Sequence, residues 1–144
     1  MYPILRTYRI FKSNLCMENY LLCIKNKQHR KALAKFRVSS HQLEIEKGRH
    51  IFPVVPESER ICNFCDTGSI DNELHFVTSC DFLSEERNIL AESISENITL
   101  SYPLDINFFV KLLESQNETV LKALCKFIYT SFKKRETQTD SLNI

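Results

Sequence analysis

Apolar residues recur at intervals of three and four along much of this chain, the spacing that places them on one face of an α-helix. The clearest case is a stripe near the C-terminus formed by Val120, Leu124, Ile128 and Phe132. A stripe of this kind is more often the core-facing side of a helix than a ligand site. Comparable patterns predict helices over 15–25, 28–39, 71–79, 82–96 and 105–113, and over the residues that follow Asn117.

Local signals mark where some of these helices begin and where the chain is not helical. Asp105 and Asn117 suit helix N-caps, because their side-chain oxygens can accept hydrogen bonds from free backbone N–H groups. Apolar and acidic residues alternate over 41–49, which predicts a weak strand or a short turn of helix that Gly48 ends. Two prolines predict an extended connector over 50–59.

The composition favours one mainly α-helical domain. The chain has 144 residues, 43% of them hydrophobic, but only 2 Gly and 4 Pro, so few tight turns are available. We expect a single domain over 1–135 that divides into a basic half (1–60), a metal-binding motif (61–82) and a helical, acidic half (83–135), followed by a flexible tail (136–144). No apolar stretch reaches membrane-spanning length, so no membrane partner is expected.

Charge is unevenly distributed although the net charge is only +1. Residues 1–60 hold 12 Lys+Arg and 5 Asp+Glu, whereas residues 61–132 hold 4 Lys+Arg and 11 Asp+Glu. This asymmetry indicates either a basic face for nucleic acid or two halves that neutralise each other inside the protein.

Three cysteines and a histidine lie close together: two residues separate Cys62 from Cys65, nine separate Cys65 from His75, and four separate His75 from Cys80. This donor set and spacing suit one tetrahedral Zn²⁺. All four positions would be protein ligands, whereas a catalytic zinc keeps one position open for water, so the sequence predicts one structural zinc.

The alternative is that these cysteines are unrelated, because free cysteine is often a small buried apolar residue. Cys16, Cys23 and Cys125 fit that interpretation, since each lies in an apolar run. The first residues do not form a signal peptide, so we expect an intracellular protein of the nucleus or cytoplasm, not secreted, with reduced thiols rather than disulfides.

Several segments together resemble a known family. In order they are Phe36-Arg37, His41, Ile45-Glu46-Lys47-Gly48-Arg49, Arg60-Ile61-Cys62 with Cys65, Asn72-Glu73-Leu74-His75-Phe76, and Cys80. This order is similar to the zinc-binding region at the C-terminal end of non-LTR (LINE-type) retrotransposon reverse transcriptases. The segment Leu5-Arg6-Thr7-Tyr8-Arg9-Ile10-Phe11-Lys12 resembles the tail segment of such polyproteins, and the similarity runs from about residue 5 to residue 135.

The chain departs from the family pattern at two places, and neither changes the four ligands. Asp71-Asn72-Glu73 stands where the family often has Glu-Asp-Glu, and Asp81-Phe82 follows the last cysteine where the family often has proline and an aromatic residue.

The resemblance implies a binding module without catalysis. The paired aspartates of the family's polymerase do not occur in this chain, and the endonuclease domain is absent too. The chain would be a detached tail and not an enzyme. In the family this zinc region is linked to gripping template RNA or target DNA. RNA or single-stranded DNA is therefore the expected partner, the parent polymerase domain a further one, and no small-molecule substrate is expected.

The residues expected to meet phosphates are Arg30, Lys31, Lys35, Arg37, Arg49 and Arg60. Some have structural alternatives: Arg37 and Arg49 could pair with nearby glutamates, and Arg60 could donate to zinc-bound sulfurs. Phe64 and Phe76 are better explained by burial beside the zinc than by stacking on bases. His41 and His50 are expected to be structural or exposed. Two other functions stay open, a zinc-stabilised protein-interaction module and a non-functional retrotransposon fragment.

Overall fold

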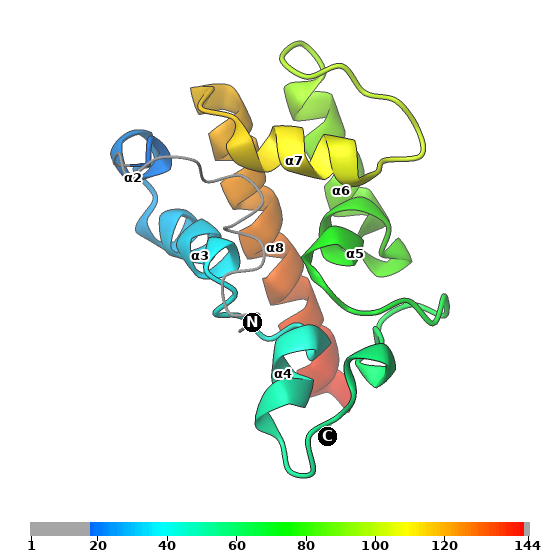
Figure 1. The fold of residues 1–144 in the computed structure, drawn as a ribbon. Coiled ribbons are helices and arrows are strands. Elements are labelled where there is room, and N and C mark those ends of the chain that lie inside the picture. The colour runs from blue at the N-terminus through cyan, green and yellow to red at the C-terminus, as the bar shows by residue number, and fades with distance from the viewer. Residues whose placement is uncertain (1–17, 143–144) are drawn as a thin grey trace.

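A computed structural model of the protein describes residues 18–142, and its helices surround one long helix, α8 (Glu118–Leu142). Helix α3 (Lys27–Arg37) packs along one side of α8 and α6 (Ser84–Ile94) along another (Figure 1). Helix α7 (Ile106–Glu114) contacts the short helix α5 (Glu73–Thr78). Within 18–142 there is no strand, only an isolated antiparallel bridge between Ile61 and Ile70. The predicted mainly α fold is confirmed.

Short elements connect these helices. They are α2 (Tyr20–Cys23), α4 (Glu44–His50) and the two 3-10 turns η2 (Glu57–Glu59) and η3 (Asp81–Leu83). Of the helices that the structure describes, none combines the length and apolarity needed to cross a bilayer.

Asparagine or aspartate side chains start four of the helices. Asp105 accepts hydrogen bonds from the backbone N–H groups of Asn107 and Phe108, and Asn117 accepts one from Val120, so both predicted caps are confirmed. Asn26 and Asn72 cap α3 and α5 in the same way. Each cap satisfies a donor that the helix itself cannot pair, an effect of about 1 kcal/mol.

One continuous apolar core lies between α8 and the helices around it. Helix α8 contributes Val120, Leu124 and Ile128 of the predicted stripe as buried side chains, Phe132 of the stripe is half-buried against the core, and Phe76 of α5 is fully buried. The Phe76 ring packs against the rings of Phe36, Phe127 and Phe132, with centroid distances of 5.9, 5.8 and 4.5 Å. The core thus joins α3, α5 and α8, and the predicted burial of Cys125 is also confirmed.

Two local expectations need correction. The helix predicted over 15–25 is helical only at Tyr20–Cys23 within the described residues, and Cys16 and the Leu5–Lys12 segment lie outside them. Of the two alternatives predicted for 41–49, the helix is the one observed, but Gly48 lies inside α4 rather than at its end. The described part of the predicted tail, 136–142, is the helical end of α8.

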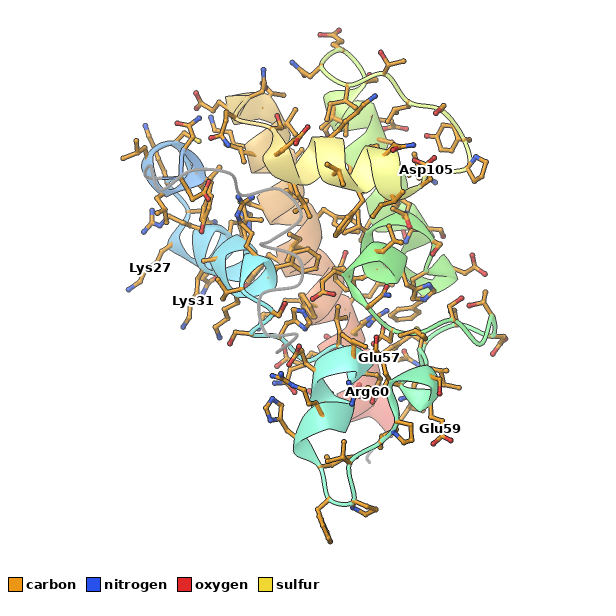
Figure 2. The ribbon with its side chains drawn as sticks, in the orientation of Figure 1. Lys27, Lys31, Glu57, Glu59, Arg60 and Asp105 are labelled. Atoms are coloured by element: carbon orange, nitrogen blue, oxygen red, sulfur yellow. The ribbon has the colours of Figure 1, made fainter. Side chains whose placement is uncertain are left out.

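Gly48 is required by a close contact, not by a turn. A Cβ atom at this position would lie 2.7 Å from Cγ and 2.9 Å from Cδ of Arg60. The Arg60 side chain lies against α4 (Figure 2) and donates to the carbonyl oxygens of Val55 and Ile45 at 2.9 and 3.0 Å. The glycine therefore makes room for the arginine that ties the 50–59 connector to α4.

Candidate metal centre

The four predicted ligands come together in the structure, with their donor atoms all within 4.8 Å of one another. The Sγ atoms of Cys62 and Cys80 are 3.8 Å apart, and Cys65 Sγ lies 3.4 Å from Nε2 of His75. Cys62 and Cys80 are buried, His75 is 4% exposed, and Cys65 is half-buried. These residues could hold one metal ion.

Two elements supply the ligands. Cys62 and Cys65 lie in a loop closed by the Ile61–Ile70 bridge and by a 2.9 Å hydrogen bond from Cys62 N–H to the Ser69 carbonyl. Gly68 turns this loop with φ +69°, a conformation that glycine adopts without strain. His75 lies in the first turns of α5, and Cys80 directly follows that helix.

Hydrogen bonds orient the donor atoms. His75 Nδ1 lies 3.1 Å from the Ser79 hydroxyl, which leaves Nε2 facing the sulfurs. The Phe64 N–H donates to Cys62 Sγ at 3.4 Å. Arg87 donates to the carbonyls of Val77 and Cys80 at 2.8 and 2.9 Å, which fixes the end of α5 between His75 and Cys80.

Arg135 of α8 completes the centre from the far end of the chain. Its NH2 group lies 3.4 Å from Cys80 Sγ and 3.6 Å from Cys62 Sγ, and its NH1 group donates to both carboxylate oxygens of Asp71 at 3.0 and 3.1 Å. The guanidinium carbon lies 4.6 Å from the ring centroid of Phe64 and 4.9 Å from that of Phe76. Burial by itself lowers the pKa of Arg135, but Asp71 and Cys80 raise it above its usual value, so the group stays charged.

The close approach of the Cys62 and Cys80 thiols shifts their pKa values in opposite directions. The hydrogen bond from Cys62 lowers the pKa of Cys80 against the effect of burial, and the same bond raises the pKa of Cys62. Burial lowers the pKa of His75, but its contacts with Cys80 and Cys65 raise it overall. Proton sharing of this kind is expected where several groups compete to be metal ligands.

A second buried polar network holds α4 and α5 together beside the centre. Glu73 accepts hydrogen bonds from Ser39 Oγ at 3.2 Å and from His41 Nε2 at 2.7 Å, while the Leu43 N–H donates to His41 Nδ1 at 3.3 Å. Asp71 accepts from the Glu44 N–H at 3.0 Å, at the start of α4. His41 is therefore structural and His50 is exposed, as expected.

The basic residues predicted to meet phosphates fall into two groups. Lys31 and Lys35 are exposed on α3, and Arg30 is half-exposed with a 2.8 Å bond to the Ile24 carbonyl. Arg49 pairs with Glu46 at 2.9 Å, which is the alternative that the sequence left open.

Arg37 and Arg60 make contacts inside the protein that differ from those the sequence predicted. Arg37 is 2% exposed, donates to the Leu113 carbonyl at 2.9 Å and pairs with Glu18 at 3.2 Å, so its charge does not face a ligand. Arg60 donates to backbone carbonyls near α4 and not to the sulfurs. The contact with the sulfurs belongs to Arg135 instead.

Sequence reasoning missed Arg135, although a signal was present. Arg135 continues the apolar stripe of α8, three residues after Phe132, so it falls on the buried face of the helix. A charged residue on such a face needs a buried partner, which indicates a polar contact inside the protein.

No protein-family model matches this chain, and no curated protein or solved structure matches it either.

Proposed function

We propose that this protein is a nucleic-acid-binding module with one structural zinc ion, related to the C-terminal end of retrotransposon reverse transcriptases. It would grip RNA or single-stranded DNA without catalysis of its own. The observation that carries the proposal is a row of exposed lysines on α3, beside a closed Cys3His cluster. The relationship to retrotransposons rests on the ordered sequence motif.

Zinc fits the donor set and its spacing. A tetrahedral zinc about 2.3 Å from sulfur and about 2.0 Å from imidazole nitrogen separates two sulfurs by about 3.8 Å, and sulfur from nitrogen by about 3.5 Å. The corresponding distances here are 3.8 Å between Cys62 and Cys80 and 3.4 Å between Cys65 and His75. When bound, the ion would join the 61–70 loop to α5 and contribute to folding stability.

Helix α3 offers a basic surface with no acidic residue in it. Lys27, Lys31 and Lys35 are spaced by four residues, so they share one face of the helix, and all three are exposed. Figure 2 shows Lys27 and Lys31 pointing away from the body of the protein. Among the ion pairs between described residues, none includes these three lysines.

The charge distribution also favours nucleic-acid binding over internal neutralisation. Between described residues, no Lys or Arg of 18–60 forms an ion pair with an acid of 61–132. The ion pairs of Lys and Arg in the described part of the basic half stay within that half: Arg37 with Glu18, Lys47 with Glu44 and Arg49 with Glu46. The positive charge of α3 is thus available to a phosphate backbone.

The test is binding of a labelled single-stranded RNA by the zinc-loaded protein, followed by fluorescence anisotropy over a salt series. We expect the logarithm of affinity to fall linearly with the logarithm of salt, with a slope of about −0.7 per phosphate contact. Lys31→Ala/Lys35→Ala should weaken binding about tenfold and reduce the magnitude of that slope by about 1.4, that is about 0.7 for each lysine. Arg30 is left in place because it bonds to the Ile24 carbonyl.

The matched control is Lys111→Ala/Lys122→Ala, which removes the same charge from two exposed lysines of α7 and α8. The RNA affinity of this control should stay within about twofold of that of the unaltered protein if binding depends on contacts with the α3 lysines and not on the net charge of the protein. No binding even at low salt, or an equal loss in both double variants, would overturn the proposal in favour of a protein-interaction module or a fragment.

A further inference from the structure

A groove runs between α3, α4 and the C-terminal half of α8, next to the metal centre. It encloses about 580 Å³, within the range of small-molecule and cofactor sites. Its walls combine polar and aromatic side chains; they include Lys31 and Lys35 of α3, Lys47 of α4, and Tyr129, Phe132 and Lys133 of α8.

The charge of the groove is positive. Five Lys or Arg residues line it against three acids, Glu44, Glu136 and Asp140. Two of the cations have acidic neighbours on their own helices, Lys47 with Glu44 at 3.2 Å and Lys133 with Glu136 at 3.4 Å. Lys31 and Lys35, which form no ion pair with a described residue, extend the exposed row of α3 into the groove.

The groove also has an aromatic wall. Phe64, Tyr129 and Phe132 line it, and all three are half-buried. Lys133 Nζ lies 5.8 Å from the centroid of the Tyr129 ring, which places an ammonium group directly beside that wall. The neighbouring hydroxyl of Tyr129 is held by Gln28 at 2.9 Å, which links the wall to α3.

Cations and aromatic rings side by side are the two components that single-strand binding requires, one for phosphate and one for bases. We infer that the groove receives one nucleotide of the bound strand. Its base would lie against Tyr129 and Phe132, and its phosphate between Lys31, Lys35 and Lys133. This inference rests on the proposed function and names the place where the strand leaves the surface of α3.

The chain offers a well-matched pair of variants for the test. Lys133 lines the groove, its side chain is 57% exposed, and it pairs with Glu136 at 3.4 Å. Lys122 lies on the same helix outside the groove, its side chain is 60% exposed, and it pairs with Glu118 at 2.7 Å. Both variants, Lys133→Ala and Lys122→Ala, remove one exposed charge and one ion pair within α8.

The experiment measures binding of an eight-nucleotide oligouridylate to the zinc-loaded protein and both variants. Lys133→Ala should weaken binding by about threefold to tenfold and reduce the salt slope by about 0.7, while Lys122→Ala stays within about twofold. In NMR spectra of the unaltered protein, the oligonucleotide should shift the ring protons of Tyr129 and Phe132.

Each other result has its own meaning. Oligouridylate that binds while Lys133→Ala matches Lys122→Ala, with no shift at the aromatic wall, would overturn the groove assignment and leave the proposed function intact. If uridine monophosphate binds as tightly as the oligonucleotide, the inference is wrong about the occupant, and the groove is a site for a free nucleotide instead of a strand. Failure of the unaltered protein to bind oligouridylate at low salt would overturn both proposals.

Discussion

Arg135 offers the sharpest test of how the metal centre is built, because one side chain serves three sets of contacts. Its guanidinium bonds to both carboxylate oxygens of Asp71, lies within 3.6 Å of the sulfurs of Cys62 and Cys80, and contacts two aromatic rings. Arg135→Met keeps the length of the side chain but removes its charge.

The expected loss is large because the partners stay buried. Asp71 is only 1% exposed, and removing one partner of a buried ion pair typically costs about 3–5 kcal/mol. The lost contact with the two rings costs about 1 kcal/mol more, which methionine partly offsets by packing against them. We therefore expect a loss of about 4 kcal/mol in the free energy of unfolding, and a metal affinity about 10–100-fold lower because the sulfurs lose their positive neighbour.

Urea unfolding at saturating zinc, followed by circular dichroism, measures the first quantity, and competition with a chelator measures the second. Lys133→Met is the control, because it lies two residues earlier on α8 and is 57% exposed. Arg135→Lys should fall between the two, since it keeps the charge but not the fork that meets Asp71. A loss below about 1 kcal/mol in Arg135→Met with unchanged metal affinity would refute the reasoning.

Three further predictions concern the fold and the ligands. Replacing glycine by alanine usually stabilises a helix, but Gly48→Ala should lower the free energy of unfolding by about 1–3 kcal/mol because the new Cβ would lie 2.7 Å from Arg60 Cγ. In an Arg60→Ala background the same substitution should cause no loss, and a double-mutant cycle measured by urea unfolding would show the difference. Phe76→Ala should lose about 3–5 kcal/mol in thermal unfolding and Phe52→Ala, at 98% exposure, less than about 0.5; equal losses would contradict the assigned core. Cys65→Ser should lose stoichiometric metal and speed hydrogen exchange in the 61–70 loop and α5 while α6–α8 stay helical; full metal content by elemental analysis would exclude it as a ligand.

The helices and the ligand set could be predicted from sequence because both depend on short-range patterns. The stripe of α8 and the caps at Asp105 and Asn117 involve residues no more than four positions apart in each step. The four ligands lie within one stretch of the chain, and their residue types restrict what they can do together. Spacing alone was sufficient to expect that they would meet.

Local patterns could not predict the structure of a segment that has similar propensities for two secondary structures. The alternating segment at 41–49 suits strand or helix equally, and the Asp71 carboxylate at the start of α4 is part of what makes it helical. The residues after 135 were expected to leave the domain as a tail, yet α8 continues to Leu142, and Arg135, directly before them, is anchored by Asp71, 64 positions earlier in the chain. Tertiary contacts thus decided between states that the chain locally allows.

By itself, then, the sequence determined the helical class, the caps at Asp105 and Asn117, and the four residues that could hold a metal ion. Only the tertiary structure decided what each arginine does. Arg37 donates to the Leu113 carbonyl, 76 positions away in the chain. Arg60 donates to the Ile45 carbonyl of α4, and Arg135 donates to the sulfur of Cys80. The physical reason is that a guanidinium is equally suited to solvent, carboxylate, carbonyl or thiolate, so its role depends on which partner the fold places beside it.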